Sequence, residues 1–192
     1  MLPTDCPAGT FTLLYNASSL ADCKSCPKGW YCKSDAAAAI IMTRCPSGVI
    51  CEGGAQTEAG TSKCPIGSYC PAASSKAIPC PPGKYCPTEG LKSSSEAIDC
   101  QAGYWCMIGS KIANPKDGIM GVECPAGKYC PAGTVTPIGC PIGKYNPNTG
   151  GKAIEDCLAC KDGFTCAKRG LSDYTGRCPA GFFCLDLTKP EL

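Results

Sequence analysis

Cysteine is the residue with the clearest chemical potential in this chain, which has 20 cysteines among its 192 residues. A thiolate can bind a metal, attack a substrate or oxidise to a disulfide, and spacing helps to separate these roles. The C-x2-C spacing typical of zinc ligands occurs only at Cys23/Cys26 and Cys157/Cys160, far apart in the sequence. Histidine, the usual partner of a nucleophilic cysteine and the commonest metal ligand, does not occur. We therefore expect no metal, no cofactor and no catalytic residue, and predict that the protein is not an enzyme.

The remaining chemistry is oxidation to disulfides. Cysteine exceeds ten per cent of the residues and the count is even, as full pairing requires. Such density is typical of oxidising compartments and indicates an extracellular or cell-surface protein, with a signal peptide expected to be absent from this sequence. The net charge of +2 is mixed along the chain, which predicts no nucleic-acid partner. No run of about twenty apolar residues occurs, so no membrane segment is expected.

Most cysteines belong to one repeated motif, C-P-x-G-x-Y-C, which we call a box. Ten boxes start at Cys6, Cys26, Cys45, Cys64, Cys80, Cys100, Cys124, Cys140, Cys160 and Cys178. The glycine recurs in all ten boxes and predicts a positive φ, as in a type II turn that has proline at its second position. An aromatic residue usually precedes the closing cysteine, where it can pack on a disulfide in place of a core. Short strand pairs, such as residues 128–129 with 134–136, are the most regular structure expected.

The spacing of the boxes repeats at a longer period. Boxes 1 and 8 lack the closing cysteine, and in each the first cysteine is followed, after sixteen intervening residues, by Cys23 or Cys157. This gives a super-repeat of about 134 residues whose second copy is cut short, a pattern typical of linear arrays. We predict four cysteine-rich modules, at residues 1–51, 52–86, 87–139 and 140–192. The expected fold class is small disulfide-rich modules, mostly irregular with short β-strands, in an elongated tandem array with little conventional hydrophobic core.

Two disulfide schemes use every cysteine, and spacing alone does not decide between them. In one, each C-x5-C pair closes on itself. In the other, adjacent boxes interlock, and this scheme is favoured because bridges across larger loops remove more entropy from the unfolded chain, roughly 2–4 kcal/mol each. The favoured pairs are Cys6–Cys23, Cys26–Cys45, Cys32–Cys51, Cys64–Cys80, Cys70–Cys86, Cys100–Cys124, Cys106–Cys130, Cys140–Cys157, Cys160–Cys178 and Cys166–Cys184.

The order C-x16-C-x2-C-x5-C-x12-C-x5-C from Cys6 to Cys51 resembles the cysteine-rich module of tumour necrosis factor receptors. The resemblance implies bridges between the first and second, third and fifth, and fourth and sixth cysteines. The C-P-x-G-x-Y phrasing is similar to ephrin-receptor-like repeats of extracellular proteins in protists and algae. The chain departs from the receptor spacing, with x5 where x2 is usual, so no ligand-binding residues carry over. These modules serve receptors, adhesion proteins and filament subunits alike.

Two loops between boxes carry apolar residues that lack an obvious core. Residues 36–42 form either a short helix on their own disulfides or a contact patch, and residues 107–122 form the longest loop. Exposed apolar clusters usually mark interfaces. The interface candidates are Ile40, Ile41, Met42, Ile108, Ile112, Ile119, Met120 and Val122. Asn16 begins an N-x-S sequon and is a candidate glycan site, the alternative being an unused sequon; serine and threonine clusters at 74–75, 93–95 and 134–136 permit O-linked glycans.

The main hypothesis is a non-catalytic extracellular structural protein, a disulfide-stapled rod that packs with copies of itself or with neighbouring repeats in a surface filament, appendage or coat. The alternative is a ligand-binding or adhesion ectodomain of a receptor-like protein, which needs a membrane segment outside these residues. A soluble inhibitor or toxin-like disulfide protein is disfavoured by the length and the repetition.

Overall fold

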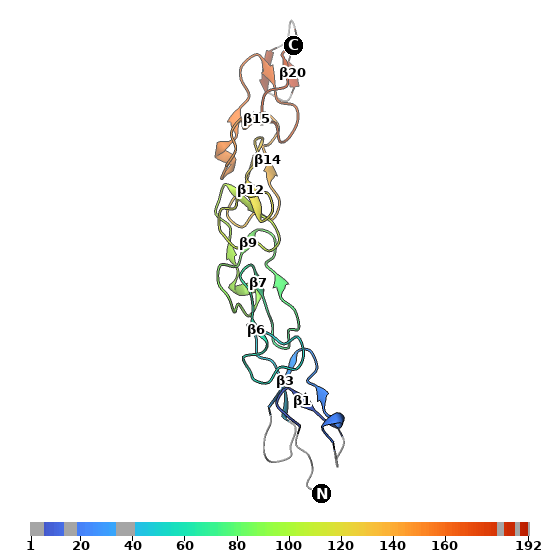
Figure 1. Cartoon of the computed structure of the whole chain (residues 1–192). Coiled ribbons are helices and arrows are strands. Elements are labelled where there is room, and N and C mark those ends of the chain that lie inside the picture. Colours follow the sequence, from blue (N-terminus) through green and yellow to red (C-terminus); the bar gives the residue numbers. More distant parts are fainter. Residues whose placement is uncertain (1–5, 14–18, 34–40, 180–182, 187–188, 192) are drawn as a thin grey trace. The chain divides into compact units, whose positions relative to one another are not determined.

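The computed structural model describes residues 6–13, 19–33, 41–179, 183–186 and 189–191, with the backbone alone described for 41, 183–186 and 189–191 (Figure 1). The chain forms two compact units. Unit 1 contains Met1–Cys80 and Cys86–Ala97, and unit 2 contains Pro81–Tyr85 and Ile98–Leu192. The limit between them falls within box 5. The four-module division stays a prediction, although backbone hydrogen bonds cross each of its proposed limits, as from the Cys32 N–H to the Ala55 carbonyl.

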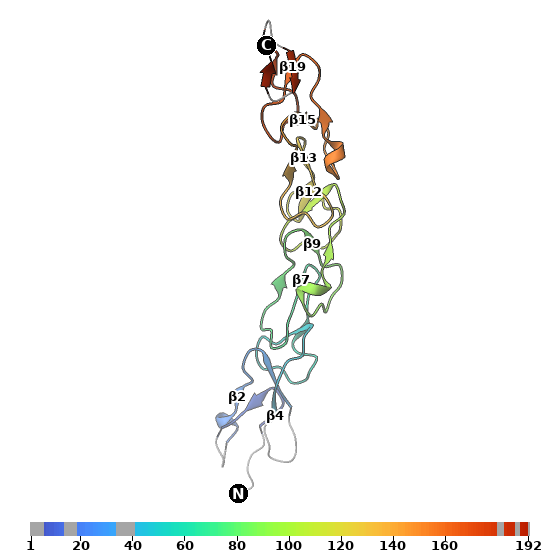
Figure 2. The same cartoon turned by 180° about the vertical axis from the view of Figure 1, so that it is seen from behind.

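Short antiparallel hairpins supply most of the regular structure in both units (Figures 1 and 2). In the hairpins from β1–β2 to β17–β18, the two residues before a closing cysteine position pair with the two residues before the next box, and the pairing extends further in β3–β4 and β11–β12. In unit 1 the pairs are β1 (Thr10–Phe11) with β2 (Lys24–Ser25), β3 (Trp30–Lys33) with β4 (Ile41–Arg44), β5 (Val49–Ile50) with β6 (Ser62–Lys63), and β7 (Ser68–Tyr69) with β8 (Ile78–Pro79). In unit 2 they are β9 (Lys84–Tyr85) with β10 (Ile98–Asp99), β11 (Tyr104–Cys106) with β12 (Gly121–Glu123), β13 (Lys128–Tyr129) with β14 (Ile138–Gly139), β15 (Lys144–Tyr145) with β16 (Leu158–Ala159), β17 (Phe164–Thr165) with β18 (Gly176–Arg177), and β19 (Phe183–Asp186) with β20 (Lys189–Glu191).

The helical structure described is three 3-10 turns, η1 (Leu20–Asp22), η2 (Ser94–Glu96) and η3 (Ile154–Asp156). Small disulfide-rich modules, mostly irregular with short strands, are therefore confirmed as the fold class. The expected pairing of residues 128–129 with 134–136 is wrong, because β13 pairs with β14, directly before box 8. In the hairpins from β1–β2 to β17–β18, the second strand lies directly before the next box.

Each box is a tight turn that leads into the first strand of its hairpin. In box 5 the Lys84 N–H donates to the Pro81 carbonyl at 3.2 Å, and Gly83 has a φ of +80°. A positive φ at the third position of the turn is the type II geometry that favours glycine. Proline is therefore the first residue of the turn, not the second as predicted. That position imposes no special φ, which explains how Gln101 and Lys161 replace proline in boxes 6 and 9.

The disulfides close within the boxes. The bridges are Cys26–Cys32, Cys45–Cys51, Cys64–Cys70, Cys80–Cys86, Cys100–Cys106, Cys124–Cys130 and Cys160–Cys166, and Cys178 is also disulfide-bonded. The predicted bridges Cys6–Cys23 and Cys140–Cys157 are confirmed. The interlocked pairs Cys26–Cys45, Cys32–Cys51, Cys64–Cys80, Cys70–Cys86, Cys100–Cys124, Cys106–Cys130, Cys160–Cys178 and Cys166–Cys184 are wrong.

The backbone of the box explains this correction. The turn and the strand after it bring Cys26 and Cys32 to a Cα–Cα separation of 5.8 Å, which suits a disulfide. The first cysteine of the next box, Cys45, instead places its backbone N–H 3.0 Å from the carbonyl of Gly29. Loop-closure entropy in the unfolded chain favours the longer bridges, but the folded geometry offers the shorter ones.

Two backbone hydrogen bonds join each box to the next one at every junction from box 1 to box 9. The box glycine donates its N–H to the carbonyl at the closing cysteine position of the next box, as from Gly29 to Cys51 at 2.8 Å. The same glycine accepts from the first cysteine of the next box, Cys45 in this case. Box 8 makes these bonds with Asn146 in the closing position, so the ladder of bonds does not require a cysteine there.

A second contact links boxes 1, 2, 3, 5, 6 and 7 to the loop after the box two places further on. In unit 1 the loop residue Gly90, with a φ of +77°, donates its N–H to the Cys64 carbonyl at 2.8 Å. Its own carbonyl lies against Gly48, where an added Cβ would be 2.6 Å from that oxygen. In unit 2 the Gly150 carbonyl lies in the same way against Gly103. Three successive boxes therefore interlock through their backbones.

Small clusters around the disulfides replace a single core. The Cys45–Cys51 bridge lies in a buried cluster with Tyr31 and Ala55. Tyr31 precedes the closing cysteine of the previous box, so the expectation that an aromatic residue packs on a disulfide is confirmed at this position. Ile50 occupies the same position in box 3 and packs with the cysteines of box 4. The low content of large buried side chains matches the prediction of little conventional core.

Candidate interaction surfaces

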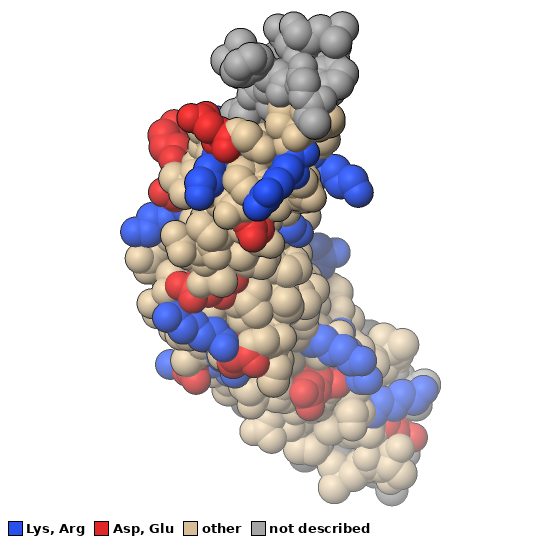
Figure 3. All heavy atoms as spheres, turned by 90° about the horizontal axis from the view of Figure 1, so that it is seen from above, with Lys and Arg blue, Asp and Glu red and all other residues tan. Residues whose placement is uncertain are grey.

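The described residues do not assemble a recognisable reactive centre. No group of three or more histidine, cysteine, aspartate or glutamate side chains among them could hold a metal ion. Basic and acidic side chains are interspersed on the face drawn in Figure 3. Across the part of the chain that the structure describes, no helix has the length and apolarity needed to cross a membrane. The candidate functional features are therefore surfaces that could contact other molecules.

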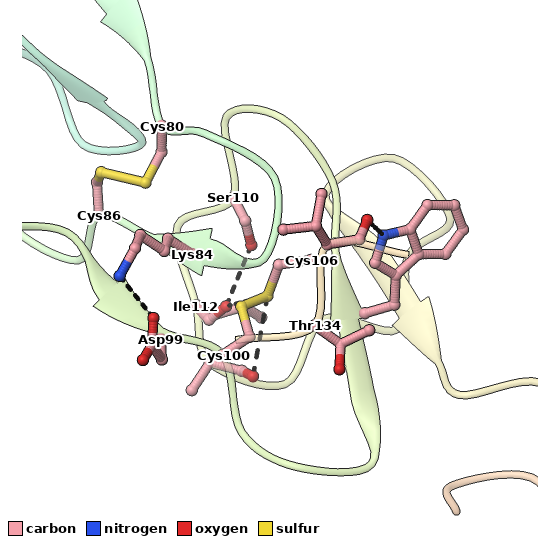
Figure 4. Close-up of a disulfide and its surroundings, with 12 residues drawn as sticks. Cys80, Lys84, Cys86, Asp99, Cys100, Cys106, Ser110, Ile112 and Thr134 are labelled. Carbon is pink, nitrogen blue, oxygen red and sulfur yellow. Dashed lines mark hydrogen bonds and ion pairs between the residues drawn. A yellow bond between two sulfur atoms is a disulfide. The ribbon is translucent and has the colours of Figure 1, made fainter. Parts of the chain in front are cut away.

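The loop of residues 107–122 in unit 2 is held by its own hydrogen bonds. The Ser110 side chain is fully buried and donates to the Ile112 carbonyl at 3.1 Å (Figure 4). Pro115 is fully buried as well, and the Met107 N–H donates to the Met120 carbonyl at 2.8 Å. These contacts fix the loop at several points along its length.

Asp117 holds the tip of this loop. Its Oδ1 accepts from the Ile119 N–H at 2.9 Å and from the Met120 N–H at 2.7 Å. These two hydrogen bonds lower the pKa of the Asp117 carboxyl below its ordinary value, because they stabilise the ionised form. The carboxylate is exposed, so the arrangement orders the loop and does not create a buried charge.

The same loop presents apolar side chains to solvent. Ile119 is 79% exposed and Ile108 is 63% exposed, and Ile112 is also exposed. Met120 and Val122 are partly buried, so the five candidates of this loop do not contribute equally. A preorganised loop that exposes isoleucines loses little entropy on binding, which favours an interface.

The other predicted interface lies mostly outside the described residues. Residues 34–40, including Ile40, are not described, and for Ile41 only the backbone is. Ile41–Arg44 forms strand β4, so the part of the proposed helix at 41–42 is a strand. Met42 lies opposite Cys32 in this hairpin and is 38% exposed.

The predicted glycan positions differ in access. Asn16 lies outside the described residues. The Thr134 side chain is buried and donates to the Pro131 carbonyl at 2.6 Å, and Ser74 makes the equivalent bond to Pro71. These two hydroxyls stabilise turns, which makes them poor acceptors for O-linked glycans. The serines at 93–95 are partly or fully exposed.

Sequence reasoning missed a row of cross-strand pairs, which we call the aromatic–aliphatic pairs. In five successive hairpins the residue before the closing cysteine position is aromatic and its partner strand offers an aliphatic residue. The pairs are Tyr69 with Ile78, Tyr85 with Ile98, Trp105 with Val122, Tyr129 with Ile138 and Tyr145 with Leu158. The sequence does contain an aliphatic residue two positions before each of boxes 5 to 9. Only the register of the hairpins shows that this residue faces the aromatic one.

Charged side chains also lie beside aromatic rings. The Arg44 guanidinium lies 5.4 Å from the Trp30 ring centroid, across the β3–β4 hairpin. The Lys84 ammonium pairs with the Asp99 carboxylate at 2.5 Å across β9 and β10 (Figure 4). Both are surface contacts in short hairpins, where such pairs contribute little to stability individually.

A small polar hollow lies beside Asn146. It has a volume of about 210 Å³ and is lined by residues of the loop at 146–152 and by Asp156. The Asn146 side chain is buried, and it donates to the Lys128 carbonyl and accepts from the Asn148 N–H. The Asp156 carboxylate accepts from the backbone N–H groups of residues 152 and 153. These bonds give the polar groups structural partners within the loop.

Comparison with known proteins does not place the chain in a family. No protein-family model matches it, and no curated protein matches it significantly. The class that the structure itself defines is a disulfide-rich array of short hairpins.

Proposed function

We propose that the chain is a non-catalytic extracellular structural protein, whose box array packs with copies of itself in a surface filament, appendage or coat. The observation that carries the proposal is the pair of backbone hydrogen bonds repeated at every junction from box 1 to box 9. These bonds join one repeated unit to the next, as in linear repeat arrays, and such arrays commonly act as scaffolds. Its bridge density suits the oxidising conditions outside the cell.

The exposed loop of residues 107–122 supports a contact role within this proposal. The loop is held by its own hydrogen bonds, and it exposes three isoleucines, Ile108, Ile112 and Ile119, in one short segment. The resemblance of the box phrasing to ephrin-receptor-like repeats agrees with a protein that contacts other proteins, whereas the observed bridges differ from those that the tumour necrosis factor receptor resemblance implies. The same loop would serve the alternative role, a ligand-binding or adhesion ectodomain, if its partner is a different protein.

Imaging by electron microscopy tests the structural role directly. Purified protein with its bridges intact should form ordered polymers as its concentration is raised. A strictly monomeric protein at high concentration would refute self-assembly and leave the ectodomain role as the better explanation. A full-length transcript that encodes a membrane-spanning helix after these repeats would point the same way.

The loop is tested with a matched pair of variants. Ile119→Asp places a charge on a side chain that is 79% exposed, so it should weaken assembly and leave the melting temperature unchanged. Ile142→Asp is the control, because Ile142 is also exposed in unit 2 but lies in the turn of box 8, outside the loop. Equal assembly of wild type and Ile119→Asp would remove the loop from the interface.

A further inference from the structure

The hairpins of the chain differ in the residue that lies across from the position before the closing cysteine. Ile98, Ile138 and Leu158 are 49%, 41% and 47% exposed, and each lies across from a tyrosine. Boxes 1 to 3 have polar residues at the same place, namely Lys24, Thr43 and Ser62. The apolar choice is therefore confined to a run of hairpins and is not required by the hairpin itself.

The exposed aliphatic residues differ from scattered surface residues because they recur at one structural position. Single exposed aliphatic side chains are common on protein surfaces and need no explanation. Here every hairpin from β9–β10 to β15–β16 carries the pair, with Val122 facing Trp105 in the one whose aliphatic residue is partly buried. A repeated apolar position in a polar surface points to a repeated contact.

We propose that the aromatic–aliphatic pairs of unit 2 are a self-association surface on which further copies of this chain pack side by side. The proposal deepens the proposed structural function and rests on it. It assigns the lateral contact to the hairpins. Val122 belongs both to its pair with Trp105 and to the end of the loop at 107–122, so the test leaves Val122 unchanged.

The area that a stable interface needs and the sides on which the hairpins lie both favour copies of the chain as the partner. A stable interface buries on the order of 1,200–2,000 Å² in total, which is more than one two-residue hairpin supplies, so a partner must also cover surface beyond a single pair. Within unit 2 the hairpin β13–β14 lies on the opposite side from β15–β16 in both views (Figures 1 and 2). One compact partner would reach only one of these sides. Copies of the chain carry the pairs at matching spacing and can pack on both.

Cross-strand stabilisation is the competing explanation, since aromatic and β-branched residues that face each other stabilise a hairpin. Threonine separates the two explanations because it keeps a high strand propensity and removes the apolar surface. The chain itself places Thr43 opposite Tyr31 in the β3–β4 hairpin. A threonine variant therefore uses a residue that this fold already accepts at that position.

The test compares three chains by sedimentation velocity, with bridges intact. The first is wild type, the second is the triple variant Ile98→Thr/Ile138→Thr/Leu158→Thr, and the third is Ile142→Thr. Ile142 is the matched control, because it is 46% exposed in unit 2 but lies in the turn of box 8 and faces no aromatic partner across a hairpin. We expect self-association at least about tenfold weaker in the triple variant, and within about twofold of wild type in the control.

Each outcome bears on one proposal. Wild-type association in the triple variant overturns the lateral surface and leaves the structural function standing. Equal weakening by Ile142→Thr also overturns it, because the effect is then general hydrophobicity. A wild type that never associates refutes the structural function itself. If the triple variant fails to fold, the three single variants Ile98→Thr, Ile138→Thr and Leu158→Thr decide. Each should weaken association more than Ile142→Thr does, and wild-type association in all three overturns the proposal.

Discussion

Ala73 gives the sharpest test of the backbone contacts that join the boxes. Among the described residues it is the one non-glycine residue with a positive φ, at +62°. It follows box 4 and donates its N–H to the Cys45 carbonyl at 2.8 Å. The equivalent position after box 5 is Gly90, with a φ of +77° and the same kind of bond. Ala73→Gly should therefore stabilise unit 1.

The expected gain follows from two opposing effects. An alanine held in the left-handed region costs roughly 1–2 kcal/mol, which glycine avoids. Glycine also adds about 0.4–1 kcal/mol of unfolded-state entropy, which opposes the gain. The net expectation is about 0.5–1 kcal/mol of added stability, equivalent to a rise in melting temperature of roughly 2–8 °C for a unit of this size.

The measurement is thermal unfolding by circular dichroism, with the bridges intact. Gly90→Ala is the mirror control, because its new Cβ would lie 3.8 Å from the Gly48 carbonyl, an ordinary contact, and only the strain would act. It should lower stability by about 0.5–1 kcal/mol. A destabilised Ala73→Gly beside a neutral Gly90→Ala would show that these loop residues do not hold a left-handed conformation, and the proposed interlock would be wrong.

Three further predictions concern the box glycine, one carboxylate and one bridge. Gly48→Ala combines a φ of +92° with a new Cβ 2.6 Å from the Gly90 carbonyl, so unfolding should show a loss of about 2–5 kcal/mol. The pKa of Asp156 is lowered by hydrogen bonds from the backbone at 152 and 153, so its contribution is present at neutral pH and is lost as the pH falls below about 4 through the folded-state pKa; Asp156→Asn should flatten the acid limb of the melting-temperature profile. The bridge Cys6–Cys23 has both cysteines partly exposed, whereas the equivalent bridge of box 8 is buried. Limited reduction with alkylation and peptide mass analysis should open Cys6–Cys23 first, and prior loss of the box 8 bridge would contradict this reasoning.

The repeated motif made the local fold predictable from sequence. A glycine at one position in ten boxes indicates a backbone constraint, and every described box glycine has a positive φ. The bridges Cys6–Cys23 and Cys140–Cys157 were also predictable, because boxes 1 and 8 leave no closing cysteine within the box. Composition alone indicated that disulfides and short hairpins would replace a core.

The pairing of the other cysteines was not predictable, because it depends on where the ladder places each backbone. Sequence separation measures the entropy of the unfolded loop, but Cys45 meets Gly29 and not a cysteine of box 2 when the chain folds. The left-handed residues after the boxes were equally hidden. In the sequence, Gly90 is one of several glycines in the connecting loops. The structure shows that its left-handed backbone places its carbonyl against Gly48. The aromatic–aliphatic pairs needed the hairpin register for the same reason.

Disulfides and hydrogen bonds stabilise different parts of this array. Every bridge with a described partner spans 6 or 17 residues, so none of them fastens one box to the box after next. Disulfides make each box rigid, while backbone hydrogen bonds and close glycine contacts join the boxes to one another. Hydrogen bonds are individually weak in net terms, so the joints between boxes are where such an array would open first under load. Lateral packing by neighbouring copies would stabilise those joints without any further covalent link, so the proposed structural role and the proposed hairpin surface support each other.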